Sequence, residues 1–391
     1  MASMVVAGLL IPSLGRGRIP STTETPGASH AKERAAAGPW GQLEYTRFAL
    51  GQPDEYLPDS TRTLETVPWF FEKYTGAQLR ELFRSVIATD AVRRRLLDTS
   101  RWEVSTKGVL VKPTPELLHD LGGPARQQIY SILNDFEANY VHRNAFRFRL
   151  DGFDEWFAHS ELTDENLDLL RSLTFTNQGG AICIVDLDVL QRKLTTNEFR
   201  RVFESLYSEP CLLIDLRVGP GTDVDALARY WGRGGRESNL LPLLRSLAKS
   251  PGGTTVSIGR LLPPFAQSRL YTFSPATTNA PGSDVDCFWT AMNFFNAQPD
   301  PGLATRAYAL DVINRDYRET TEARRFGDML VLYGEQRQTI HACVYIADDV
   351  VFTKNGADYL QPWVLMKIPD MLAHYATDER VKLVTLRPRK F

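Results

Sequence analysis

Apolar residues in the first half of the sequence recur every three to four positions, which is the period of an amphipathic helix. The spacing predicts a helix that begins at Thr75 and carries apolar side chains from Leu79 to Val86, and a second helix near Ala125. Residues 146–150 instead alternate between apolar and basic side chains, as a half-buried strand does. The region before residue 180 is therefore expected to be rich in helix, with some strand.

The pattern changes between residues 180 and 275, where apolar runs are separated by amphipathic helices. The runs AICIVDLDVL and CLLIDLRV are strand-like. Between them Thr195 and Glu198 have the spacing of a capping box at a helix start, and a further helix is expected from Asp223. Strands that alternate with helices are typical of an α/β unit. Cys183 and Cys211 lie inside the apolar runs and are expected to pack as small buried hydrophobes.

The first 60 residues lack any such period. Residues 15–60 are rich in Gly, Pro, Ser, Thr and charge, which is typical of a flexible arm. The apolar stretch from Met4 to Leu14 is too short to span a bilayer. It is consistent with a remnant of a secretory signal, although no Lys or Arg precedes it. The compartment is left unknown by the sequence, with an extracytoplasmic or periplasmic location as the hypothesis.

Composition and charge narrow the classes of partner. Apolar residues make up 43% and charged residues 24% of the chain, as in a soluble globular protein. The 45 Lys and Arg nearly balance the 47 Asp and Glu, so no overall field attracts nucleic acid, and no integral membrane segment is recognisable. The four cysteines form no CxxC motif and no short Cys/His spacing. Neither a metal nor an organic cofactor is indicated.

Candidate chemistry lies near the C-terminus, in the segment GSDVDCFWTAMNFF. Ser283 or Asp284 can cap a helix that runs to Phe295 and holds Cys287 in its first turn. A thiol at that position faces the positive end of the helix dipole and unpaired backbone N–H groups, which favour thiolate and can bind an oxyanion. Asp286 opposes this effect by repelling negative charge, so a basic partner is needed.

That basic partner is expected on the strands that follow. Gly327–Asp328 is expected to turn the chain into the strand MLVLY, and His341 opens a second strand, HACVYI. A histidine on a sheet that packs against the cysteine helix can take the thiol proton and later protonate a leaving amine. After a turn at Asp348–Asp349, period-two alternation puts Thr353 and Asn355 on one strand face, where either can orient the imidazole.

This order of residues resembles the NlpC-type cysteine peptidases and amidases of the bacterial cell wall, a branch of the papain-like fold. The resemblance spans about residues 280–375 and rests on Asp286–Cys287, Gly327–Asp328 and the strand-turn-strand unit that His341 opens. It implies that Cys287 is the nucleophile, that His341 is the base and that a polar residue on the next strand is the third member. By register Thr353 falls at the third position, but an amide is chemically better suited to hold an imidazole, so we assign Asn355.

Two positions depart from the pattern of that family and bear on substrate class. Phe288–Trp289 replaces a small Ser–Gly pair, and Cys343 replaces a glycine. Cys343 is a rival nucleophile, since it lies two residues beyond His341 on the same strand face, but it is expected to be buried packing.

The patterns together predict an α+β protein with three parts. A flexible arm at 1–60 precedes a helical plus α/β region of unknown role at 61–275. Residues 276–391 form a papain-like domain in which a helix comes first and an antiparallel sheet follows.

The function that follows is a thiol hydrolase that cleaves an amide or peptide bond through an acyl-enzyme. The resemblance implies peptidoglycan peptides as the substrate. Two alternatives stay open. One is an acyltransferase of the same fold, like the relatives of lecithin-retinol acyltransferase, which would need an apolar acceptor groove. The other is a catalytically inactive binding or scaffold protein, in which residues 61–275 are the active partner.

Overall fold

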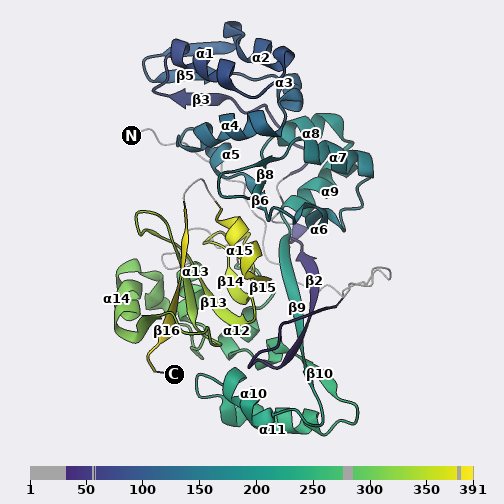
Figure 1. The fold of residues 1–391 in the computed structure, drawn as a ribbon, viewed down its shortest axis with the longest axis vertical. Helices are drawn as coiled ribbons and strands as arrows, with labels where there is room; N and C mark the ends of the chain where they lie inside the picture. Colours follow the sequence, from purple (N-terminus) through teal and green to yellow (C-terminus); the bar gives the residue numbers. More distant parts are fainter. Residues whose placement is uncertain (1–31, 55–56, 58, 276–284, 377–379, 391) are drawn as a thin grey trace, which may run out of the picture. The chain divides into compact units, whose positions relative to one another are not determined.

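The protein combines helices with several antiparallel sheets, including a six-stranded sheet near the C-terminus (Figure 1). The computed structural model describes residues 32–54, 57, 59–275, 285–376 and 380–390. The α+β class expected from the sequence is confirmed at this level.

The strands form four sheets within the described residues. The first, in the order β1-β2-β9-β10, contains β1 (Glu33–Arg34), β2 (Gln42–Leu50), β9 (Glu209–Val218) and β10 (Thr254–Ser257). Two small sheets have the orders β3-β5-β4 and β6-β8-β7, from β3 (Trp69–Glu72), β4 (Trp102–Ser105), β5 (Gly108–Val111), β6 (Phe146–Phe148), β7 (Phe175–Thr176) and β8 (Ile182–Ile184). The C-terminal sheet has the order β11-β16-β12-β13-β14-β15, from β11 (Tyr317–Thr320), β12 (Met329–Tyr333), β13 (Thr339–Ala347), β14 (Val350–Lys354), β15 (Trp363–Lys367) and β16 (Lys382–Pro388).

Helices occupy most of the connections between these strands. In the first half they are α1 (Gly76–Ser85), α2 (Asp90–Leu96), α3 (Pro115–Asp120), α4 (Gly123–Asn134), α5 (Tyr140–Arg143), α6 (Phe153–Phe157), α7 (Asp164–Ser172), α8 (Leu187–Lys193) and α9 (Thr196–Leu206). In the second half they are α10 (Val224–Trp231), α11 (Glu237–Ala248), α12 (Pro264–Arg269), α13 (Cys287–Met292), α14 (Arg306–Asp316) and α15 (Ile368–His374). In the part of the chain that the structure describes, no helix is both long and apolar enough to cross a bilayer.

Capping residues set the helix starts that the sequence predicted. Thr75 caps α1 and exchanges hydrogen bonds with Gln78, and Thr195 caps α9 in the same way with Glu198. Asp223 caps α10 by accepting from the N–H of Ala226. These predictions are confirmed, because a side-chain acceptor satisfies backbone donors that the helix itself leaves unpaired.

The α/β unit predicted for residues 180–275 is not formed. Of the first apolar run only Ile182–Ile184 becomes a strand, β8, and its second half begins helix α8, whereas the second run becomes β9. The two strands belong to different sheets, and every strand pairing they make is antiparallel. The alternating exposure along β9, where Leu213 is exposed and Leu212 and Ile214 are buried, shows a strand with one covered face. A central strand of a parallel sheet would be buried on both faces.

Part of the predicted flexible arm is a long strand. β2 pairs with β9 along its whole length, and Leu43 and Tyr45 are buried (Figure 1). The expectation of an arm therefore fails for residues 42–50, because LEYTRFAL alternates like a strand amid polar neighbours. The stretch Met4–Leu14 lies outside the described residues.

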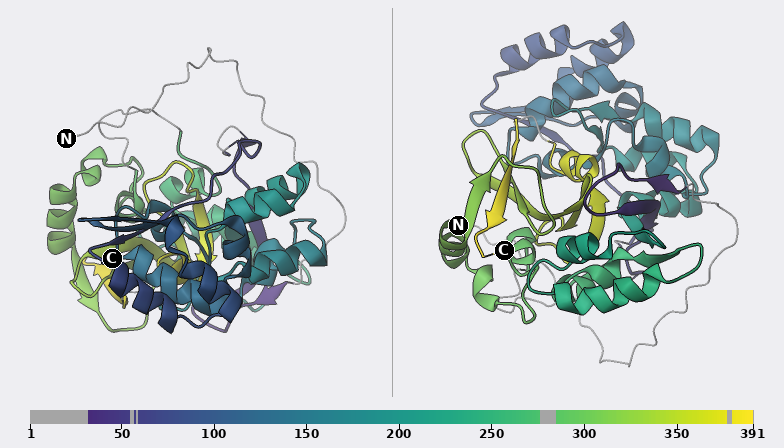
Figure 2. Two further views of the ribbon diagram at one scale, coloured as in Figure 1. Left: turned by 90° about the horizontal axis from the view of Figure 1, so that it is seen from above. Right: turned by 60° about the horizontal axis from the view of Figure 1, so that its bottom comes forward.

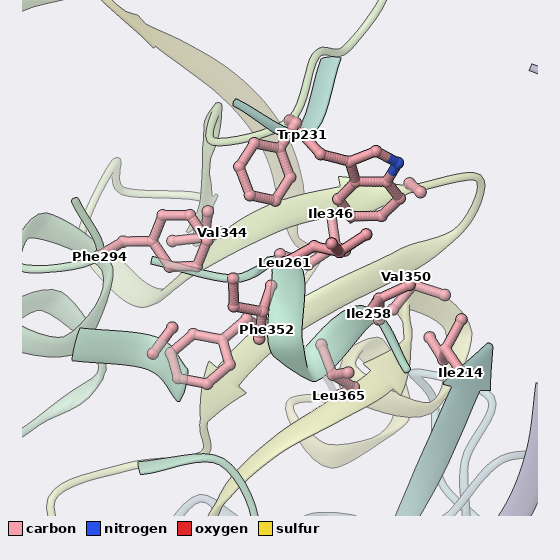
Figure 3. Packing of buried hydrophobic residues seen from close by; sticks show 14 of the residues in the cluster. Ile214, Trp231, Ile258, Leu261, Phe294, Val344, Ile346, Val350, Phe352 and Leu365 are labelled. Carbon is pink, nitrogen blue, oxygen red and sulfur yellow. The ribbon is translucent and has the colours of Figure 1, made fainter. Parts of the chain in front are cut away.

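A single hydrophobic cluster joins residues on both sides of position 275. Ile214 and Trp231 from the earlier part pack in the same cluster as Val344, Phe352 and Leu365 from the C-terminal sheet (Figure 3). The expected domain boundary at residue 275 thus does not separate two cores. A second cluster is built from β3 to α9.

Both faces of the central strands β13 and β14 are covered. Along β13, Ala342 and Val344 belong to the cluster shown in Figure 3, whereas Cys343 and Tyr345 belong to a smaller cluster on the opposite face. Helix α13 contacts β13 and β14, and helix α15 contacts β15 and appears beside the sheet in Figure 2. Polar side chains that project from these strands are therefore buried.

Two leucines on β9 test this arrangement. Leu216 is fully buried, so Leu216→Ala should lower the free energy of unfolding by about 2–5 kcal/mol through lost burial and a residual cavity. Leu213 on the opposite face is 46% exposed, and Leu213→Ala should cost less than about 1 kcal/mol. Urea unfolding of both variants measures the difference. Equal losses would mean that β9 does not present one face to the core.

Candidate active site

Cys287 is the first residue of helix α13 and is 6% exposed. The helix is capped by Asp286, whose carboxylate accepts a hydrogen bond of 2.7 Å from the N–H of Trp289. The expected caps, Ser283 and Asp284, lie outside the described residues, and α13 ends at Met292 rather than at Phe295. The carboxylate three positions before Trp289 has the spacing of a capping residue, so it sets the start of the helix.

The Cys287 thiol lies where β13 and β14 separate. The two strands pair only over residues 344–347 and 350–352, although β13 begins at Thr339 and β14 continues to Lys354. In the unpaired portion, the backbone N–H of Ala342 donates a hydrogen bond to the thiol. A strand amide that would otherwise pair with β14 is thus directed at sulfur.

The thiol is protonated at neutral pH. Burial raises the pKa of Cys287 to about 11, and the negative charge of Asp286 adds to the rise. Hydrogen bonds from the backbone N–H groups of Ala342, Phe288 and Cys287 itself act in the opposite direction. The sequence led us to expect a thiolate favoured by the helix N-terminus, but α13 has only six residues and desolvation outweighs its dipole.

His341 is fully buried on β13 and stacks on Tyr375, with ring centroids 4.3 Å apart. Its Nε2 lies 2.9 Å from Oγ1 of Thr353, whereas its Nδ1 has no hydrogen-bond partner among the described residues. Burial lowers the pKa of His341 to about 3, and the neighbouring His374 lowers it further. The imidazole is therefore neutral, with one ring nitrogen left to accept a proton.

Thr353, rather than Asn355, makes the direct contact with His341. The Thr353 hydroxyl donates to Oδ1 of Asn355 over 3.2 Å, so Asn355 is one hydrogen bond further from the ring. Asn355 in turn donates through Nδ2 to Oε1 of Glu209 over 2.8 Å. The structure brings Cys287, His341 and both proposed third residues into one region, and Asn355 reaches the imidazole only through Thr353.

A buried lysine near Cys287 was not predicted. Lys354 is fully buried, donates to the carbonyl oxygens of Gly356 and Asp358, and lies 5.8 Å from the ring centroid of Trp363. Burial lowers the pKa of Lys354 to about 8, while the charges of Asp358, Cys287 and Asp286 oppose this shift. Lys354 therefore supplies positive charge close to the thiol.

Glu209 and Tyr375 also escaped sequence reasoning. Glu209 opens β9 in a different sheet, and Tyr375 follows α15. Neither has a local motif that signals a role, since both come to the site through tertiary packing. Lys354 ends the strand β14, whose five residues are all buried, and its place just beyond the apolar run VVF was the signal that the sequence offered for it.

The Gly327–Asp328 turn has a structural role. Gly327 adopts a positive φ of 86°, and the buried carboxylate of Asp328 accepts from the backbone N–H of Arg325. The same carboxylate forms an ion pair of 2.8 Å with Arg387 on β16. The predicted turn into MLVLY is confirmed, and Asp328 ties that turn to β16.

The remaining cysteines are buried. Cys183, Cys211 and Cys343 are each no more than 2% exposed, as expected for packing residues, and no disulfide joins any of the four cysteines, all of which lie in described segments. Across the described ranges, no group of His, Cys, Asp and Glu side chains is arranged to hold a metal ion.

Comparison with known proteins gives no match to a protein-family model, to a curated protein or to a solved structure. Any assignment of function to this chain therefore rests on the geometry and chemistry of the site.

The buried state of His341 can be tested through the pH dependence of stability. Its pKa is about 3 in the folded protein and about 6.5 in the unfolded chain, so its stabilising contribution is complete above pH 6.5 and is lost as the pH falls toward 3. Between pH 7.5 and pH 5 this loss is about 2 kcal/mol. Urea unfolding should show that His341→Gln loses about 2 kcal/mol less than the parent over this interval.

His142, which is also buried and whose pKa is lowered by burial to about 4, provides a positive control. His142→Gln should likewise lose about 2 kcal/mol less than the parent between pH 7.5 and pH 5. If His341→Gln retained the parental pH dependence, the His341 ring would have to be accessible to water and protons in the folded protein.

Proposed function

We propose that this protein is a cysteine hydrolase that cleaves an amide or peptide bond, with Cys287 as the nucleophile and His341 as the base. One observation carries the proposal. The Cys287 thiol contacts the backbone of Ala342, the residue next to His341, and the Nδ1 of that histidine is buried without a hydrogen-bond partner among the described residues. A thiol held next to the histidine strand, with a ring nitrogen of His341 that can still accept a proton, is a starting arrangement for nucleophilic catalysis. Substrate binding would have to bring Sγ and Nδ1 within hydrogen-bond reach.

The reaction begins from neutral partners. As Sγ of Cys287 attacks the carbonyl carbon of the substrate, its proton passes to Nδ1 of His341, and the carbonyl oxygen becomes the oxyanion of a tetrahedral intermediate. Collapse of the intermediate breaks the C–N bond, and the imidazolium gives its proton to the leaving amine. Water then attacks the thioester with His341 as base, which releases the acid and restores the thiol.

Backbone N–H groups can stabilise the oxyanion. Those of Cys287 and Phe288 are directed at the sulfur in the resting protein, together with that of Ala342. Donors fixed in place before the reaction need no reorganisation when negative charge develops, which is the basis of oxyanion stabilisation.

The papain-like fold and the NlpC-type branch are part of the same proposal. Support comes from the order of elements, in which the cysteine helix α13 precedes β12, the histidine strand β13, a tight turn and β14. Peptides of the bacterial cell wall are the substrate class that this interpretation favours, with an extracytoplasmic location.

The nucleophile is tested by turnover of a panel of peptide amides that includes a peptidoglycan stem peptide. Cys287→Ala should lower kcat/KM by about 10³-fold or more, because it removes the thiol proposed to form the acyl-enzyme. Cys343→Ala, which removes the rival thiol on β13, should leave turnover largely intact. Mass spectrometry of the parent during turnover should find the acyl group on Cys287.

Turnover that survives in Cys287→Ala would refute the assignment. A Cys287 that forms no acyl adduct and is not alkylated by iodoacetamide, in a protein that still binds such a peptide, would favour the binding or scaffold alternative.

The role of Lys354 is tested by Lys354→Met, which removes the charge but retains an unbranched apolar chain. Because the ammonium and a Cys287 thiolate stabilise each other, the pKa of Cys287 should rise and its alkylation at pH 7, where Lys354 is protonated, should slow. Lys367→Met provides the control, since Lys367 on β15 is paired with Asp349. An alkylation rate unchanged in Lys354→Met would remove Lys354 from the site.

A further inference from the structure

A continuous series of hydrogen bonds links His341 to an acid from another sheet. It runs from Nε2 of His341 to the Thr353 hydroxyl (2.9 Å), from that hydroxyl to Oδ1 of Asn355 (3.2 Å), and from Nδ2 of Asn355 to Oε1 of Glu209 (2.8 Å). All four side chains are no more than 6% exposed. Since bulk water does not reach them, each must satisfy the next.

The acid end of this series determines the direction of every bond in it. A carboxylate can only accept a hydrogen bond, so the group of Asn355 that faces an ionised Glu209 must be its NH₂. The sulfur of Met366, a weak acceptor 3.4 Å from the same Nδ2, requires the same orientation. The Oδ1 of Asn355 then faces Thr353.

The direction continues to the imidazole. Because Oδ1 can only accept, the single hydroxyl proton of Thr353 is used toward Asn355, and the Thr353 oxygen must accept from His341. His341 therefore carries its proton on Nε2, and Nδ1 keeps its lone pair. This is the tautomer in which Nδ1 can remove the proton from Cys287.

We propose that Glu209 is a positioning residue which, in its ionised form, fixes the His341 tautomer that leaves Nδ1 as the base. The catalytic meaning of this inference rests on the proposed function, whereas the tautomer itself can be observed without turnover. It also gives the part of the chain before residue 275 a role in the site, because Glu209 belongs to β9.

A proton on Glu209 removes the constraint. A protonated carboxyl can donate to the Oδ1 of a reoriented Asn355, and every bond then reverses, so that Thr353 donates to Nε2 and the proton of His341 moves to Nδ1. Burial raises the pKa of Glu209 to about 8, with the hydrogen bond from Asn355 opposing the rise and Asp370 adding to it. The two forms therefore exchange in the mildly alkaline range.

Other groups around Glu209 contribute to its charge environment. Cys211 on the same strand and Tyr375 after α15 interact with it electrostatically, and both stay neutral because burial raises their pKa values. Asp370 on α15 carries charge, but it is paired with Arg47 and Arg149. Glu209 is therefore the group expected to titrate next to Asn355.

The experiment reads the His341 tautomer by ¹⁵N NMR of histidine-labelled protein, with His341→Gln used to assign the signal. At pH 9 the parent should show Nε2–H, and at pH 6 it should show both tautomers. Glu209→Gln, whose amide can either donate or accept, should show both tautomers at pH 9. It should also lower kcat, with little change in KM, by the factor by which the Nε2–H population falls, which is about 2-fold if the two tautomers are equally populated.

A double variant separates hydrogen-bond direction from mere disruption. In the Glu209→Gln, Asn355→Asp double variant, the carboxylate introduced by Asn355→Asp can only accept, so it receives one hydrogen bond from the amide introduced by Glu209→Gln and one from the Thr353 hydroxyl. The Nε2–H tautomer should return at pH 9, and kcat should recover relative to Glu209→Gln. Glu204→Gln, a partly exposed acid on α9, is the control and should match the parent.

The inference is overturned if the parent holds Nδ1–H at pH 9, or if Glu209→Gln keeps pure Nε2–H with parental kcat. A double variant that shows both tautomers at pH 9 would also contradict it. If Glu209→Gln does not fold, the parental tautomer at pH 9 decides alone. A parent that shows Nε2–H but never turns over a substrate would refute the proposed function and leave the inference intact.

Discussion

Burial of polar side chains is the constraint on which the site depends. An unpaired polar group inside a protein costs about 1–3 kcal/mol, so His341, Thr353, Asn355 and Glu209 are stable only while each is bonded to the next. The series crosses from the C-terminal sheet to the strand β9 of the first sheet. Completing these hydrogen bonds therefore fixes the position of the two sheets relative to each other. The site and the core of the protein must form together.

The same burial explains why the resting site carries little charge. Desolvation raises the pKa of Cys287 and lowers that of His341, so the thiol and the imidazole are both neutral. A protonated thiol reacts slowly with oxidants, because the thiolate is the nucleophilic form. Under the proposed mechanism, a cysteine held in this state is protected while no substrate is bound, and it gains reactivity when the substrate and the nearby ammonium of Lys354 stabilise negative charge.

Local patterns predicted local structure well, and they failed where structure depends on distant partners. Capping residues and apolar spacing located the helices α1 and α9, the strand β13 that holds His341, and its neighbours β12 and β14. These signals act within a few residues of the chain. Whether β9 pairs parallel or antiparallel depends on β2, more than 150 residues away, and no local signal carries that information. The site divides in the same way: Cys287 and His341 were recognisable from motif order, whereas Glu209 and Tyr375 are brought to the site by tertiary packing and carry no local motif.

The position of β16 has a consequence for how the chain folds. This strand is the last of its sheet to be synthesised, yet it inserts between β11 and β12, and its Arg387 completes the ion pair with Asp328. Until it arrives, the apolar strand β12 presents one unpaired edge, which is a template for association with other chains. Closure of the sheet must therefore follow translation of β16, and the nascent chain is most prone to aggregate in the interval before that strand leaves the ribosome.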